Sequence, residues 1–288
     1  MTHRFNQLPR SRVSFQDTPT RSVDVGGTAF VYRELGPKTG VPVILLNHLG
    51  AQLDNFDPRI VDGLAANRRV IAFDNRGIGA SGGKTPSSIA EMARDAVAFV
   101  RALGFDQVDL FGFSLGGFVA QEIVLTEPTL GRKLILAGTG PAGGEGIDKV
   151  TPLTIVDMIK GALTLRDPKY YLFFTRTANG RRAAKAFLQR LTERQADRDK
   201  PVSLSAFGAQ LRAVKAYGLQ APQDLSVIRI PALIANGDHD RMVPSGNTHD
   251  LARRIPGAQL VIYPDAGHGG VFQHHADFVP KASAFLEA

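Results

Sequence analysis

The chain has 288 residues, 34 of them Lys or Arg and 27 Asp or Glu, for a formal net charge of +7, and it has no cysteine. Hydrophobic residues make up 43% of it, enough for a large core, yet no apolar run approaches the roughly 18 residues of a membrane-spanning helix. Disulfides are therefore excluded, and no membrane span is expected. Basic residues do not form a stripe interleaved with aromatic residues, so we expect no nucleic-acid partner.

Residues 1–20 are polar and basic and are expected to form a flexible N-terminal segment. They lack the apolar stretch of a secretory signal, and a cytoplasmic location is expected on that basis. Two strand-like runs, 21–25 and 29–35, then flank Gly26-Gly27. A glycine pair between two such runs predicts a β-hairpin.

Strand-like and helix-like runs alternate from residue 41 onward. The predicted strands cover 41–46, 70–73, 108–111, 133–137, 232–235 and 260–263, and the predicted helices cover 58–66, 88–103, 115–126 and 276–287. Alternation of this kind is typical of a mostly parallel sheet with helices on both faces. Asp74 and Arg76, at the end of the second of these strands, are interpreted as residues that brace a loop.

The alternation stops between residues 141 and 222. Four helix-like stretches stand there instead, at 153–165, 168–177, 181–194 and 203–217. We interpret this region as a helical insertion that divides an α/β core into residues 21–140 and 223–288. From Glu145 to Lys215 the chain has 14 Lys or Arg and seven Asp or Glu. The insertion therefore carries the net positive charge, which either attracts anions at long range or simply marks a solvated helical face.

The most informative stretch is Gly112-Phe113-Ser114-Leu115-Gly116. It has the form Gly-x-Ser-x-Gly, follows a predicted strand and precedes a predicted helix. In that context a serine hydroxyl is presented on a sharp, strained turn, and the glycines remove Cβ atoms that would collide with neighbouring elements. The pattern predicts that Ser114 is a nucleophile; a glycine-rich turn with a capping serine is the alternative.

A serine nucleophile needs a base to take its proton and an acid to orient the base. Candidates for both follow predicted strands: Asp238 and Asp240 come after the run that ends at residue 236, and His268 comes after the run that ends at residue 263. Open α/β sheets place their sites at this edge. Asp238 is the alternative acid. The pair His274-His275 stands in a chain without cysteine, and we expect no metal site.

These motifs resemble those of the α/β-hydrolases from about Ser22 to the C-terminus. The family's Gly-x-x-Asp-x-x-x-Pro setting of the acid matches Gly237, Asp240 and Pro244, and its Gly-His pattern matches Gly267-His268. The resemblance implies an α/β-hydrolase fold: a mostly parallel eight-stranded twisted sheet with helices on both faces and an inserted helical cap. It also implies a catalytic triad of Ser114, Asp240 and His268 and no cofactor.

The family stabilises the oxyanion with two backbone N–H groups. One belongs to the residue after the nucleophile, here Leu115, and the other to the loop after the first parallel strand. This loop reads Asn47-His48-Leu49-Gly50, where most relatives have His-Gly. Its similarity to 3-oxoadipate enol-lactonases implies Leu49 as the donor, and a register shifted by one residue would make it Gly50. His48 is either a substrate contact or a loop-packing residue.

The resemblance implies a cofactor-free serine hydrolase that cleaves a small carboxylic ester, lactone or thioester through an acyl-enzyme on Ser114. Carbon–carbon bond hydrolases and cofactor-free perhydrolases use the same residues, and a non-catalytic receptor on this fold is a further alternative. We expect Tyr170 and Phe174 of the cap to line an apolar substrate pocket with basic residues on its rim. The sequence is compatible with a monomer and with a homodimer.

Overall fold

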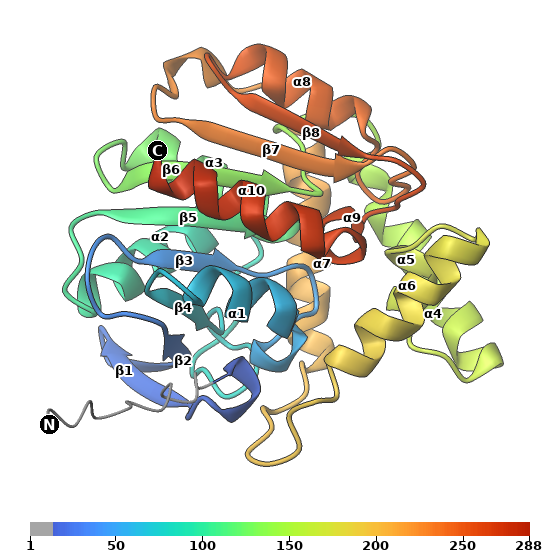
Figure 1. The fold of residues 1–288 in the computed structure, drawn as a ribbon, viewed down its shortest axis with the longest axis horizontal. Helices are drawn as coiled ribbons and strands as arrows, with labels where there is room; N and C mark the ends of the chain where they lie inside the picture. The colour runs from blue at the N-terminus through green and yellow to red at the C-terminus, as the bar shows by residue number, and fades with distance from the viewer. Residues whose placement is uncertain (1–13) are drawn as a thin grey trace, which may run out of the picture.

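An eight-stranded β-sheet forms the centre of this computed structural model, which describes residues 14–288 (Figure 1). The strands lie in the order β1-β2-β4-β3-β5-β6-β7-β8; β1, β2 and β4 pair antiparallel, and all pairs from β4 onward are parallel. The strands are β1 (Arg21–Val25), β2 (Thr28–Leu35), β3 (Val43–Leu46), β4 (Val70–Phe73), β5 (Val108–Phe113), β6 (Gly131–Ala137), β7 (Ala232–Gly237) and β8 (Gln259–Tyr263). The expected mostly parallel, eight-stranded sheet is confirmed.

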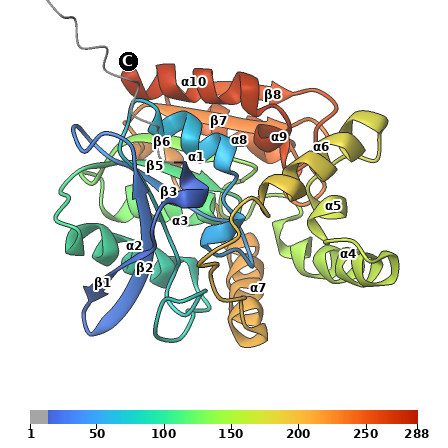
Figure 2. The same ribbon diagram turned by 60° about the horizontal axis from the view of Figure 1, so that its bottom comes forward.

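Helices cover both faces of the sheet. Within residues 14–288 they are α1 (Pro58–Ala65), α2 (Ile89–Ala102), α3 (Leu115–Thr126), α4 (Val150–Thr164), α5 (Lys169–Leu172), α6 (Ala178–Arg190), α7 (Leu204–Gly218), α8 (Gly246–Arg254), α9 (Gly270–Gln273) and α10 (His275–Glu287). Helices α1 and α10 pack together on one face, and α2 and α3 pack together on the other (Figures 1 and 2). Strands β3, β4 and β5 are consequently buried along their whole length, as expected for parallel strands between two helical layers.

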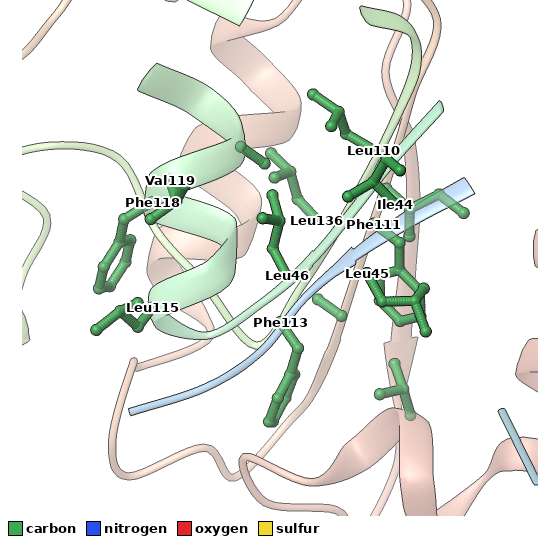
Figure 3. Close-up of a cluster of buried hydrophobic side chains, with 14 of the residues drawn as sticks. Ile44, Leu45, Leu46, Leu110, Phe111, Phe113, Leu115, Phe118, Val119 and Leu136 are labelled. Atoms are coloured by element: carbon green, nitrogen blue, oxygen red, sulfur yellow. The ribbon is translucent and has the colours of Figure 1, made fainter. Parts of the chain in front are cut away.

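The core forms because neighbouring strand residues point to opposite faces of the sheet. Leu46 and Leu136 lie between the strands and α3 (Figure 3). The ring of Phe111, on the other face, lies 5.6 Å from that of Phe278 in α10. Helix α3 is therefore held firmly against the sheet, and so is the turn that precedes it.

The N-terminal hairpin forms as predicted. Gly26 and Gly27 have φ values of +58° and +83°, a left-handed conformation that glycine adopts without steric cost. The expected flexible segment falls partly on residues 1–13, which lie outside the described residues. The remainder is packed: Phe15 is buried, and its N–H donates to Asp62 in α1 at 2.6 Å.

Helices α4 to α7 lie between β6 and β7 in the chain. In Figures 1 and 2, α4, α5 and α6 gather at one end of the molecule, beyond the carboxyl ends of β7 and β8, and α7 returns along the core. The helix expected over 168–177 is shorter, because α5 ends at Leu172. Among the described residues, no helix is long and apolar enough to cross a membrane.

The segment after α6 is tied to the core by charged groups. Arg190 donates to the buried carboxylate of Asp57 at 2.6 Å. Arg194 donates to the carbonyl oxygens of Gln16 and Thr18 at 2.7 and 2.9 Å. Because breaking a buried ion pair is strongly destabilising, these contacts fix the end of α6 against the sheet.

A second contact between the core and the segment before α7 is made by two carboxyl groups. Asp74, after β4, and Asp199, before α7, meet beside Gly79, where a Cβ atom would collide with both side chains. Burial raises the pKa of Asp74 well above its ordinary value, and Asp199 raises it further, since two neighbouring carboxyl groups repel each other when both are ionised. Arg76 pairs instead with Asp95 at 2.8 Å.

Candidate active site

Ser114 occupies the turn between β5 and α3. Its backbone has φ 56° and ψ −119°, a conformation that costs a non-glycine residue energy and persists only where the surroundings enforce it. Its N–H donates to Ala137 at 2.9 Å, and its carbonyl oxygen accepts from the Gly117 N–H at 2.8 Å and from the Thr139 hydroxyl at 2.9 Å. Three hydrogen bonds thus hold the strained turn in place.

The glycines of the motif are required by close packing. A Cβ atom on Gly116 would collide with the carbonyl oxygen of Leu46 in β3, and one on Gly112 would collide with the backbone at Gly116 and Gly117. Helix α3 can therefore start directly against the sheet only because these positions lack side chains.

His268 and Asp240 form a buried pair. Nδ1 of His268 lies 2.8 Å from Oδ2 of Asp240, and both side chains are fully buried. The other oxygen, Oδ1, accepts from the N–H groups of Met242 and Val243 at 2.8 and 3.0 Å. A carboxylate only accepts hydrogen bonds, so the ring proton belongs on Nδ1 and the lone pair on Nε2. Nε2 is buried and has no hydrogen-bond partner among the described residues.

The alternative acid, Asp238, points elsewhere. Its Oδ1 lies 2.6 Å from Nδ1 of His239 and accepts from the N–H of Ala266 at 3.1 Å. Partial burial opposes ionisation, but these hydrogen bonds outweigh it and lower the pKa of Asp238. The structure thus brings Asp240, and not Asp238, to His268.

Ser114 and His268 lie close together in the structure. The ring of Phe113, next to Ser114, lies 5.0 Å from the imidazole of His268. Gly138, which follows the acceptor of the Ser114 N–H, lies so close that its Cβ position is 3.3 Å from Nδ1 of His268. Within residues 14–288, no hydrogen bond joins Oγ of Ser114 to Nε2 of His268; such bonds are often long before a substrate binds.

The loop after β3 presents two candidate oxyanion donors. The N–H of Gly50 is occupied, because it donates to Oε1 of Gln210 in α7 at 2.8 Å. The N–H of Leu49 donates no hydrogen bond to any of residues 14–288. Leu115 begins α3, where the N–H groups lack partners within the helix and the helix dipole favours negative charge. The pairing of Gly50 favours Leu49 and Leu115 as donors.

His48 belongs to this loop, and its side chain is buried. Its Nδ1 donates to the carbonyl oxygen of Leu49 at 2.8 Å, and its ring lies edge-on to Phe113 and Phe173 at 5.8 and 5.0 Å. Burial lowers the pKa of His48 to about 3, and the charge of Lys169 contributes to the shift. The imidazole is therefore neutral at ordinary pH, with a buried Nε2 that has no partner in the described part of the chain.

The aromatic residues in and near α5 line different parts of the structure. Phe174 lines an open hollow of about 720 Å³ together with Asp240 and Gly267. Tyr170 lies under the guanidinium of Arg166, 4.7 Å from its ring centroid, on another hollow. Phe173 lies against both imidazoles, 5.0 Å from His48 and 5.2 Å from His268. Phe173 thus contacts both imidazoles, whereas Tyr170, which we expected to line the pocket, lies elsewhere; a turn as short as α5 gives no periodicity from which to choose between them.

A cavity of about 170 Å³ adjoins the loop of His48, Leu49 and Gly50. Its remaining lining is mostly apolar and comes from α4, α5, α7 and the loop after β7: Thr154, Met158, Asp167, Pro168, Lys169, Leu172, Phe207 and Met242. The charged members, Lys169 and Asp167, pair with each other at 3.1 Å. Among residues 14–288, no three His, Asp or Glu side chains are arranged to hold a metal ion.

Comparison with known proteins identifies the family. Residues 41–275 match the family model of the alpha/beta hydrolase fold. An alpha/beta hydrolase fold protein from Chitinophaga pinensis is 37% identical and superimposes with a TM-score of 0.90 over 96% of this chain and 99% of its own. A protein from Azorhizobium caulinodans named as carbamate hydrolase RutD is 29% identical over 82% of this chain and 86% of its own. The enol-lactonase from Burkholderia xenovorans, at 22% identity, has the same fold with a TM-score of 0.76 over 93% and 100% of the two chains. The chain therefore belongs to the α/β-hydrolase family.

Proposed function

We propose that the protein is a serine hydrolase that cleaves a small carboxylic ester, lactone or thioester through an acyl-enzyme on Ser114. The observation that carries the proposal is the buried Asp240–His268 pair, in which Nε2 of His268 is unpaired beside the strained serine turn. This arrangement makes His268 a suitable base, because its free Nε2 can accept the proton of a nearby hydroxyl group.

In the proposed reaction, Oγ of Ser114 attacks the carbonyl carbon while Nε2 of His268 takes the hydroxyl proton. The same nitrogen then gives this proton to the leaving group, and Asp240 stabilises the positively charged imidazole in between. Water, activated by His268, releases the acid and restores Ser114. The steps use protein groups and water alone, so we propose no cofactor and no metal.

The N–H groups of Leu49 and Leu115 hold the oxyanion in this scheme. Each donor of such a hole contributes about 3 kcal/mol to the transition state in comparable enzymes. The unpaired N–H of Leu49 supports its assignment, whereas the N–H of Gly50 already has a partner.

The helices α4 to α7 act as the cap of the proposed enzyme. The apolar cavity at Leu49 favours a small neutral acyl or alcohol group, since the cations near it are paired or exposed and an unpaired buried cation is costly. Relatives named for carbamate and enol-lactone hydrolysis agree with attack on a carbonyl carbon.

The test is covalent labelling with a fluorophosphonate probe, combined with turnover of p-nitrophenyl esters of graded chain length. The wild type should be labelled at Ser114, and Ser114→Ala should lose both labelling and turnover. Ser205→Ala, which removes an exposed hydroxyl of α7, is the control and should behave as wild type. Substantial turnover by Ser114→Ala would refute the mechanism, and ligand binding without turnover by the wild type would favour a receptor.

A further inference from the structure

Helix α4 buries polar residues as well as apolar ones and leaves several large aliphatic residues exposed. Its inward-facing positions include Thr154, Asp157 and Gly161, of which Asp157 pairs with Arg241 at 3.3 Å. Its outward positions are aliphatic and continue one residue past the helix end, with these exposed fractions: Ile155 48%, Val156 60%, Ile159 56%, Leu163 81% and Leu165 95%. We call these five residues the α4 face.

The packing of the monomer does not account for the exposed aliphatic side chains of the α4 face. A surface helix normally turns its apolar stripe inward and its polar residues outward. Large aliphatic side chains gathered on one helix and left in water mark an interaction site. Helix α4 lies at the edge of the molecule (Figure 2), and the exposed fractions of the α4 face show that no other described residues cover it.

The surroundings of the α4 face are strongly basic. From Lys149 to Lys185 the chain has eight Lys or Arg and two Asp, and both acids are already paired, Asp157 with Arg241 and Asp167 with Lys169. Four exposed cations line a hollow of about 370 Å³: Arg166, which follows the end of α4, and Arg181, Arg182 and Lys185 of α6. The positive charge beside the aliphatic face is therefore uncompensated.

We propose that the α4 face docks on the surface of an anionic lipid bilayer, with aliphatic side chains entering the interface and the flanking cations contacting the headgroups. Helices that lie in a membrane interface combine these two features, and basic residues near an anionic leaflet add attraction. A second copy of this chain fits less well, because a two-fold contact through α4 would bring the same uncompensated cations together.

Docking there would place the proposed active site next to the lipid. Thr154 and Met158 of α4 line the cavity that also contains Leu49 and His48. An ester dissolved in the bilayer would therefore meet the mouth of the cavity directly. This extension to the substrate rests on the proposed function, whereas the docking itself does not.

The experiment is sedimentation of the full chain with vesicles of phosphatidylcholine, with and without phosphatidylglycerol. The wild type and Ser114→Ala should bind only the anionic vesicles, and salt should weaken the binding. Leu163→Ser/Leu165→Ser and Arg181→Glu/Arg182→Glu should each weaken it by about tenfold or more. The matched controls change exposed residues elsewhere: Leu219→Ser/Val227→Ser and Arg229→Glu/Arg253→Glu should bind as wild type.

Equal sedimentation with and without phosphatidylglycerol, or equal losses in the matched controls, would overturn the proposal. A dimer in light scattering that Leu163→Ser/Leu165→Ser dissociates would also overturn it and assign the face to self-association. Retention on acidic proteins, with no binding to anionic vesicles, would assign it to a protein partner instead. Turnover retained by Ser114→Ala would refute the proposed hydrolase mechanism while leaving the docking result intact.

Discussion

Gly50 and Gln210 are joined by a 2.8 Å hydrogen bond from the Gly50 N–H to the side-chain oxygen of Gln210. The bond links the loop after β3 to α7, 160 residues further along the chain. Gln210 is fully buried, so this contact is protected from water. It fixes the peptide beside Leu49, the proposed oxyanion donor, from the side of α7.

Loss of the Gln210 acceptor should therefore impair catalysis more than binding. Gln210→Met keeps the volume but leaves the Gly50 N–H unpaired, and kcat should fall by about tenfold with little change in KM. Gln210→Glu, which keeps an oxygen, should retain more activity. The check is steady-state kinetics on variants shown by melting to be folded; equal losses in both would show that the acceptor is irrelevant.

Substitution of Asp240 should lower kcat far more than substitution of Asp238. Asp240→Asn places a neutral amide on Nδ1 of His268 and favours the wrong imidazole tautomer, so kcat should fall by several orders of magnitude, with about 10⁴-fold as the serine-protease precedent. Asp238→Asn disturbs only the contacts to His239 and Ala266 and should have a much smaller effect. Ester turnover by both variants measures this, and the reverse ranking would move the acid to Asp238.

Substitution of His48 should leave the pH dependence of the reaction unchanged. Because burial holds its pKa at about 3, His48 stays neutral at every pH well above that value. The acidic limb of kcat/KM should therefore have the same midpoint in the wild type and in His48→Gln. A shifted midpoint would show that His48 shares the titrating proton.

Asp74→Asn should stabilise the protein at alkaline pH. The pKa of Asp74 is raised in the folded state, so its contribution to stability is present below the unfolded pKa and lost as pH rises through the folded one. The uncharged variant should melt a few degrees above the wild type at about pH 8, and the difference should shrink at about pH 5. Thermal melts at both values decide this, and a variant less stable at the higher pH would contradict it.

The sequence predicted the candidate site residues that stand directly after strands. Ser114, Asp240 and His268 could be found because parallel strands end at one edge of the sheet, so order along the chain predicts neighbourhood in space. Phe173, Gln210 and Asp199 could not, since all three come from the inserted helices, and no local pattern encodes how those helices lie on the core. Tyr170 and Phe173 are both aromatic and three residues apart, and only packing decides which one faces His268.

The ties between insertion and core are unevenly distributed. The end of α6 is fastened through Arg190 to Asp57, and α7 through Gln210 to Gly50. Among the described residues, α4 has one ion pair to the core, between Asp157 and Arg241, although it lines the cavity beside Leu49. A laboratory evolution library confined to Thr154 and Met158, the α4 residues that line this cavity, would therefore vary which molecules fit while leaving the proposed catalytic groups and these contacts unchanged.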